Sequence, residues 1–113
     1  GHGFIIEKKN SCIVFTQDTG PTDRIWELAK EKKNLKAIFS EVSFPNNMMQ
    51  IAIDSQHHTP STMEQEIKKM PADVPIFLGH LKPNFQNQLF KEIDLLGNER
   101  ISVLGSDDTS YVF

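Results

Sequence analysis

The stretch Phe15-Thr16-Gln17-Asp18-Thr19-Gly20-Pro21-Thr22-Asp23 decides the fold class, because it joins a predicted strand to a predicted helix. An apolar run, residues 12–15, leads into it and is typical of a buried strand. Gly20-Pro21 ends that strand, and either of the next two residues is a suitable helix N-cap. Asp18 is therefore expected just past the C-terminal end of a strand, where α/β sheets bind ligands. Its carboxylate either serves a metal or substrate there, or caps the turn through backbone N–H groups.

The composition predicts one globular domain over residues 1–113, since 38% of the residues are hydrophobic and 24% are charged. The formal net charge of −3 argues against a general nucleic-acid surface, which needs an excess of basic residues. No apolar run has the length of a membrane span, so we expect no membrane partner.

Cys12 is the single cysteine, and its apolar surroundings in the sequence predict an inert core residue. A lone cysteine is typical of a reducing compartment, and we expect a cytoplasmic location. Gly1 and His2 are typical of the residues that a cleaved expression tag leaves, so His2 is not counted in any site.

Alternating strand and helix patterns predict an α/β fold with a mainly parallel sheet. The apolar run before His57, residues 48–53, begins as a loop or a helical turn and ends as a strand-like stretch. The next helix begins either at Ser61, through a capping box, or at Thr59 with Pro60 as its first residue. In order, the patterns predict a hairpin of residues 3–7 and 12–15, a helix at 22–33, a strand at 37–39, a helix that Pro71 ends, a strand at 74–78, a helix at 84–96 and a strand at 101–104.

Three polar residues share one position in these patterns. Asp18, His57 and His80 each follow an apolar strand-like run and precede a proline and a helix start. Such ends meet at one edge of a parallel sheet, and carboxylate and imidazole ligands suit zinc, manganese or iron. The alternative is chance, because the loops that join strands to helices are generally polar.

Three motifs resemble hydrolases of the metallo-β-lactamase fold. Residues 17–22, Gln-Asp-Thr-Gly-Pro-Thr, resemble the Gly-Asp-Thr-Gly-type turn of these enzymes. Residues 55–60, Ser-Gln-His-His-Thr-Pro, resemble the Ser-Gly-His-Leu-Thr-Pro stretch of their class II cyclic-nucleotide phosphodiesterases. Residues 79–83, Gly-His-Leu-Lys-Pro, resemble the His-x-Lys-Pro of the same class. Order and spacing agree from about residue 3 to the C-terminus.

The resemblance implies a role for each matching residue. Asp18 matches the aspartate that bridges two metal ions, and His80 matches the last metal-ligand histidine. His57 matches a histidine that supports phosphate binding or protonates the leaving group, and Lys82 falls near the scissile phosphate. His58 stands where the family usually has leucine, and we expect it to be a packing or exposed residue.

The chief metal motif of this superfamily, His-x-His-x-Asp-His, is missing, and the four histidines of this chain cannot form it. The resemblance therefore implies the C-terminal half of an αββα sandwich, with a mixed, mostly parallel sheet flanked by helices. It implies part of a metal-dependent phosphodiesterase for cyclic nucleotides, with zinc, manganese or iron as cofactor, and little activity in this chain alone.

Two other interpretations stay open. One is an RNA 3′-end endonuclease of the same fold, and the other is a non-catalytic assembly module. If the chain is half of such a sandwich, one face of its sheet needs a partner, whether the function is catalysis or assembly. That partner is the missing N-terminal half or a second copy of the chain. We expect a homodimer, with exchange of the hairpin at residues 3–15 as one route.

Overall fold

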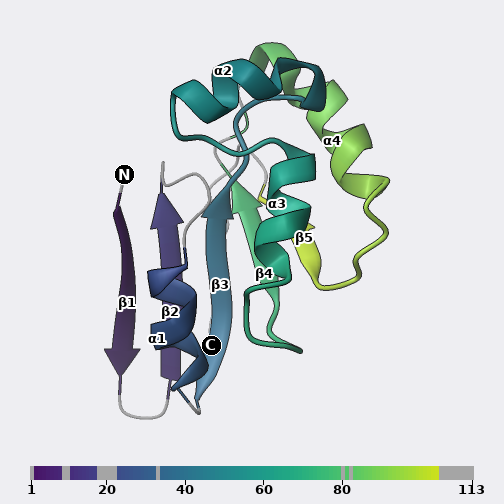
Figure 1. The fold of residues 1–113 in the computed structure, drawn as a ribbon. Coiled ribbons are helices and arrows are strands. Elements are labelled where there is room, and N and C mark those ends of the chain that lie inside the picture. The colour runs from purple at the N-terminus through teal and green to yellow at the C-terminus, as the bar shows by residue number, and fades with distance from the viewer. Residues whose placement is uncertain are drawn as a thin grey trace.

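The computed structural model describes residues 2–8, 11–17, 23–32, 34–79, 81 and 83–104, which form an α/β domain with one mixed sheet (Figure 1). The strands lie side by side in their order along the chain. β1 is antiparallel to β2, and each later neighbouring pair is parallel, so the predicted hairpin and mainly parallel sheet are confirmed. The strands are β1 (His2–Lys8), β2 (Ser11–Gln17), β3 (Leu35–Glu41), β4 (Ile76–Gly79) and β5 (Ile101–Val103).

The helices in the described ranges are short, and α4 is the longest with nine residues. None of them combines the length and the apolar character that crossing a bilayer requires. They are α1 (Arg24–Lys30), α2 (Met49–Asp54), α3 (Pro60–Ile67) and α4 (Gln86–Asp94), with 3₁₀ turns η1 (Asn46–Met48) before α2 and η2 (Pro83–Phe85) before α4.

Helices α1, α3 and α4 pack on one face of the sheet. Side chains from all three, among them Trp26, Met63 and Leu89, join one buried cluster with Ile38 and Ile76 of the sheet. Each helix connects two neighbouring parallel strands, and the strand order always advances in the same direction. Because such crossovers are right-handed almost without exception, the connecting helices are placed on the same face.

The other face of the sheet carries a row of stacked phenylalanines. Phe15, Phe39 and Phe77 are register partners on β2, β3 and β4, and side chains alternate between faces along each strand. Their ring centroids lie 4.9 Å and 5.0 Å apart, and the rings are nearly parallel. This face is therefore aromatic, whereas the aliphatic face is the one beneath the described helices.

A buried carboxylate joins α1 to α3. Glu66 is only 1% exposed, and its Oε2 accepts a hydrogen bond of 2.6 Å from the indole Nε1 of Trp26. Lys69 completes the group, because its Nζ lies 3.1 Å from Oε1 of Glu66 and 2.9 Å from Oδ1 of Asp23. The hydrogen bond to Asp23 and then that to Glu66 raise the pKa of Lys69 above 10.5, while burial opposes the shift. The charge of Glu66 is thus compensated in the core, as burial of a carboxylate requires.

The helix starts agree with the sequence only in part. Thr59 is the N-cap of α3: its hydroxyl accepts from the Thr62 amide at 3.2 Å and its own amide donates to the Thr62 hydroxyl at 2.8 Å. This outcome favours the second of the two predicted starts. Asp23 is the N-cap residue of α1, which is one of the two predicted positions, but its carboxylate binds Lys69 and makes no cap hydrogen bond. Asn84 is not a cap, because it lies inside the turn η2 that precedes α4.

The helical spacing of apolar residues predicts several core positions correctly, although Leu28, on the apolar stripe of the helix predicted at residues 22–33, is 39% exposed. Met63, Ile67 and Met70 are all buried, as their helical spacing predicts. Cys12 is fully buried, and burial is the main reason that the pKa of its thiol is raised, with the nearby charge of Glu7 adding to the effect. A raised pKa lowers the thiolate fraction at neutral pH, which agrees with an inert core cysteine.

Candidate functional site

The carboxyl ends of the central strands meet at one edge of the sheet. β2 ends at Gln17 and β4 ends at Gly79, on either side of β3, which ends at Glu41 (Figure 1). These ends are level, because Glu41 is the register partner of Gly79 and Val42 continues the pairing by donating its amide to the Gly79 carbonyl. The predicted site residues Asp18, His80 and Lys82 lie outside the described residues, but two of them directly follow strands that end here.

A pocket of about 190 Å³ lies at this edge. Phe15 and Phe39 form an apolar side of the pocket, and the backbone of Gly79 forms another. A Cβ on Gly79 would lie 3.3 Å from the Leu104 side chain, so glycine permits the close approach of Leu104 that helps enclose the pocket. The space is small, and an incoming group would reach mainly the ends of the strands.

Glu41 is the described carboxylate that lines this pocket. It ends β3 and is partly buried. Glu41 is not among the residues predicted for the site, although it follows the apolar run at residues 37–39 much as Asp18 follows residues 12–15. The position of a carboxylate shortly after an apolar strand is the sequence signal that would have predicted Glu41.

Two hydroxyl groups support the pocket from inside the sheet. Thr16 and Ser40 are 3% and 4% exposed, and their hydroxyl oxygens lie 2.6 Å apart. Both residues line the pocket from neighbouring strands, one at the end of β2 and one at the end of β3. Each hydroxyl satisfies the other, and together they hold the two strand ends in register.

His57 lies near this edge but not in the pocket. The apolar run before it is the helix α2 and not a strand-like stretch, so His57 follows a helix end. Its amide donates to the Ala52 carbonyl at 2.8 Å, and its ring packs against Phe44 with centroids 5.8 Å apart. Phe44 in turn lies 6.4 Å from the ring of Phe85, at the start of α4. The structure thus places His57 between the segment after β3 and the segment after β4.

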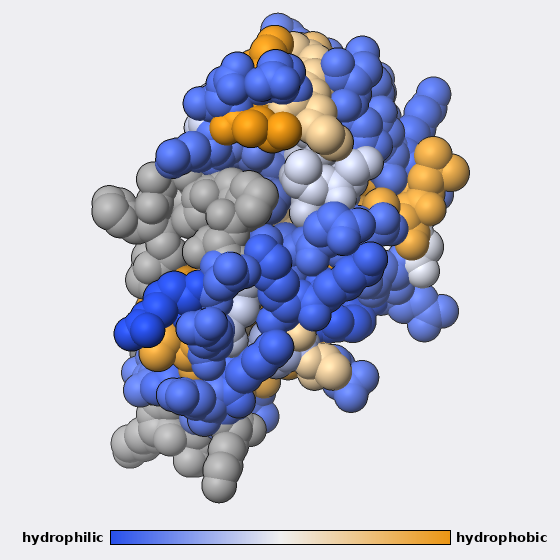
Figure 2. All heavy atoms as spheres, viewed as in Figure 1, coloured by the Kyte–Doolittle hydropathy of each residue, from blue (hydrophilic) through white to orange (hydrophobic). Residues whose placement is uncertain are grey.

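The helical state of residues 49–54 has a local cause. Met49 and Ala52 favour a helix, and among the described residues Ile51 and Ile53 pair with no strand of the sheet. The result is an unusually apolar surface, because Ile51 and Ile53 are about half exposed. Figure 2 shows hydrophobic side chains at the upper end of the molecule, over α2, beyond the arrowheads of β3 and β4 in Figure 1.

His58 is a structural residue, as predicted. It is 3% exposed, and its Nδ1 lies 2.9 Å from the hydroxyl of Thr62. Its carbonyl accepts hydrogen bonds from the amides of Ser43 and Phe44, which ties the segment after β3 to the start of α3. This pairing brings the neighbouring His57 to the carboxyl end of the sheet.

Metal donors in the described ranges are too scattered to form a site by themselves. Within these ranges no three His, Cys, Asp or Glu side chains come together as a metal site would require. The described carboxylate at the pocket is Glu41, and Asp18 and His80 belong to the part of the chain that is not described. The two carboxylates and one imidazole of these residues have the donor chemistry of zinc, manganese and iron sites.

The Thr16–Ser40 contact can be tested by a double-mutant cycle. We expect Thr16→Val and Ser40→Ala each to lower the free energy of unfolding by about 1–3 kcal/mol, because each leaves one buried hydroxyl without a partner. The double variant should lose less than the sum of the two, since no hydroxyl is then left alone. Urea unfolding measures this, with Ser55→Ala on the exposed end of α2 as a control that should change stability by less than about 0.5 kcal/mol. Additive losses would contradict the contact.

Comparisons with known proteins do not assign the chain to a family. A scan against models of protein families found no match, and searches of curated proteins and of solved structures also found none. The resemblance to metallo-β-lactamase-fold hydrolases therefore stays a prediction that depends on the three motifs. The structure establishes an α/β domain with a mixed sheet, and it does not identify the family within that class.

Proposed function

We propose that this chain supplies part of a metal-dependent site that hydrolyses phosphodiesters at the carboxyl edge of β2, β3 and β4, with cyclic nucleotides as the first substrate class. One observation carries the proposal: Asp18 and His80 directly follow two strands that end level with each other on either side of Glu41. In a parallel sheet this edge is where ligands bind.

The donor chemistry supports a divalent metal held by this chain together with a partner. Asp18 and His80 would be ligands, and Glu41 is a candidate for a further oxygen ligand because it lines the pocket between the two strand ends. Stable zinc sites have three or four protein ligands, and the enzymes that the motifs resemble hold two metal ions, so two or three ligands from this chain would leave such a centre incomplete. When bound, such a metal activates water and orients phosphate oxygens for in-line attack.

The remaining roles belong to basic side chains. Lys82 would stabilise the negative charge of the phosphate. It lies in the same short segment of sequence as His80, directly before η2. His57 would donate a proton to the leaving oxygen or bind the phosphate. The partly buried ring of His57 against Phe44 restricts its orientation, which favours a positioned proton donor over a freely moving one.

The backbone at Gln56 supports the resemblance around His57. Gln56 has a φ of +58°, in the left-handed region that glycine adopts more readily than any other residue. The phosphodiesterase stretch that residues 55–60 resemble has glycine at this position. A left-handed turn at residue 56 is thus a backbone requirement that the family motif would also satisfy.

A partner is the natural source of the missing ligands. The chain lacks a His-x-His-x-Asp-His segment, and helices α1, α3 and α4 pack on one face of the sheet. In a sandwich of two such halves, the opposite faces of the sheets would pack together, and the stacked row of Phe15, Phe39 and Phe77 has the aromatic character of such an interface. The net charge of −3 disfavours the RNA-cleaving alternative.

Metal binding and hydrolysis test the proposed site. The chain alone should bind zinc or manganese weakly, and a separately made polypeptide with the His-x-His-x-Asp-His segment should confer tight binding and hydrolysis of a generic phosphodiester. With that polypeptide present, His80→Ala should remove both metal affinity and turnover. His57→Ala should keep the metal but lower turnover roughly a hundredfold, as expected for loss of general acid catalysis.

The control for these variants is Asp54→Ala, which removes an exposed carboxylate of α2 outside the pocket and should change neither property. Full turnover by His57→Ala would contradict only the role assigned to His57 and would leave the metal site in place. If this chain and the added polypeptide together bind no metal, the enzyme proposal as a whole is contradicted.

The second candidate function is a non-catalytic assembly module. The observation that favours it is the same division of the sheet into a face covered by helices and a face with a phenylalanine row. This function predicts a homodimer in the absence of metal and of any other polypeptide. Light scattering at high micromolar concentration measures the mass, and a monomer at that concentration would contradict the dimer.

A further inference from the structure

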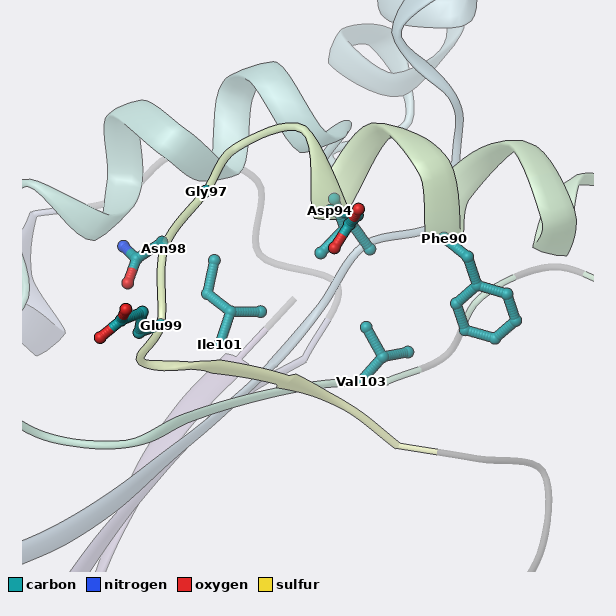
Figure 3. Close-up of a pocket in the computed structure, with 8 residues that line it drawn as sticks. Phe90, Asp94, Gly97, Asn98, Glu99, Ile101 and Val103 are labelled. Atoms are coloured by element: carbon teal, nitrogen blue, oxygen red, sulfur yellow. The ribbon is translucent and has the colours of Figure 1, made fainter.

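A second pocket, of about 350 Å³, lies between α4 and β5, away from the carboxyl-edge site. Ile101 and Val103 rise from β5 toward the helix, Phe90 lies at one end, and Asn98 and Glu99 lie at the other (Figure 3). Its volume falls at the lower end of the range of small-molecule pockets, which is roughly 300–1,000 Å³.

The base of this pocket is apolar. Ile93 is 5% exposed and belongs to the main core, and Ile101 and Val103 pack against the same core. Phe90 extends the apolar surface outward, because its ring is 39% exposed. A ligand would therefore gain by burying an aliphatic portion against these side chains.

The rim of this pocket is acidic. Asp94 on α4 and Glu99 in the turn before β5 both line it, and none of the described residues that line it carries a positive charge. Two basic residues are adjacent in the chain to lining residues. Lys91 follows Phe90 on α4 and is exposed. Arg100 is directed elsewhere: its Nε donates to the Val74 carbonyl at 3.0 Å and its Nη2 donates to the Pro71 carbonyl at 2.7 Å. Asp94 and Glu99 thus line the pocket at two places, and backbone carbonyls hold the guanidinium of Arg100.

The turn that closes this pocket is fixed by its own hydrogen bonds. Gly97 has a φ of +62° and ends α4, and a Cβ built on it would meet no atom within 4 Å, which marks open space beside the turn. Asn98 then accepts hydrogen bonds from the amides of Arg100, through its side chain, and Ile101, through its carbonyl. A ligand would meet a preformed site and would lose little affinity to ordering of the protein.

We infer that this pocket binds an organic cation with an aliphatic body, such as an alkylammonium group. The aliphatic portion would lie on Ile93, Ile101 and Val103, and the ammonium would lie between Asp94 and Glu99. The same chemistry occurs in free amines and in the lysine side chain of a partner polypeptide, and the two sources are separated by experiment. The inference is independent of the proposed phosphodiesterase site, which lies at other strand ends.

The test is a titration of the 113-residue chain with n-pentylammonium, followed by methyl NMR of Ile93, Ile101 and Val103. We expect saturable shifts of these methyl signals with n-pentylammonium and much weaker ones with pentanoate, which has a similar body and the opposite charge. The double variant Asp94→Asn with Glu99→Gln should weaken binding about fivefold to tenfold, as expected for two exposed charge pairs. The matched control, Asp54→Asn with Glu64→Gln, removes two exposed carboxylates elsewhere and should change binding less than twofold.

Equal binding of pentanoate, equal binding by the Asp94 and Glu99 variant, or shifts confined to other parts of the chain would each overturn the inference. Nα-acetyl-lysine amide separates the two sources. Tighter binding of this compound than of n-pentylammonium supports a lysine of a partner polypeptide as the ligand, and the reverse order supports a free amine. The substituted residues are exposed, and unchanged spectra of the core methyl groups will verify that the variants are folded.

Discussion

The hydrogen bond between the Trp26 indole and the Glu66 carboxylate is the constraint on which much of the remaining structure depends. It joins helices that are forty residues apart in the chain, and it buries a negative charge in the core. A buried carboxylate is tolerated only when it is hydrogen-bonded and its charge is compensated, and Lys69 supplies the compensation. The geometry therefore fixes α1 relative to α3 more narrowly than apolar packing alone would do.

This arrangement separates the two faces of the sheet. With α1, α3 and α4 on the aliphatic face, the phenylalanine row lies on the other face, and the strand ends converge at the edge where Glu41 lines a small pocket. Three surfaces with different chemistry result: an aromatic sheet face, a polar carboxyl edge and an acidic pocket beside β5. The function that we propose uses the first two, and the cation pocket uses the third.

The sequence was informative where a short stretch determines its own structure. The hairpin, the parallel strands and the buried stripe of Met63, Ile67 and Met70 follow from periodicity. Gly97, which adopts a left-handed conformation after α4, marks the point beyond which the helix does not continue. Local patterns failed where distant residues decide. Asp23 occupies the N-cap position that the sequence allows, but Lys69 binds the carboxylate that would otherwise cap the helix. The pattern of residues 48–53 does not show that this run forms a helix and pairs with no described strand.

The candidate site could be predicted only as a location. The rule that polar residues after parallel strands share an edge places the ends of β2 and β4 correctly, and it would also have found Glu41. His57 reaches the same end of the sheet by a different route, through the pairing of the His58 carbonyl with the segment after β3. That route depends on a tertiary contact, which the spacing of motifs along the chain does not contain. The same limitation applies to Asp94 and Glu99, which lie beside an aliphatic pocket only once α4 and β5 have packed together.

The central claim is that the Trp26–Glu66 hydrogen bond fixes the helices on the sheet, and a double-mutant cycle tests it most directly. Unfolding free energies of the parent, Trp26→Phe, Glu66→Met and the double variant give the coupling between the two side chains, apart from the packing that each substitution removes, because methionine has no oxygen to accept the indole hydrogen bond. We expect a coupling of about 2 kcal/mol, as for a buried hydrogen bond to a charged group. Losses that add to within about 0.5 kcal/mol would show that the two residues act independently and would contradict the claim.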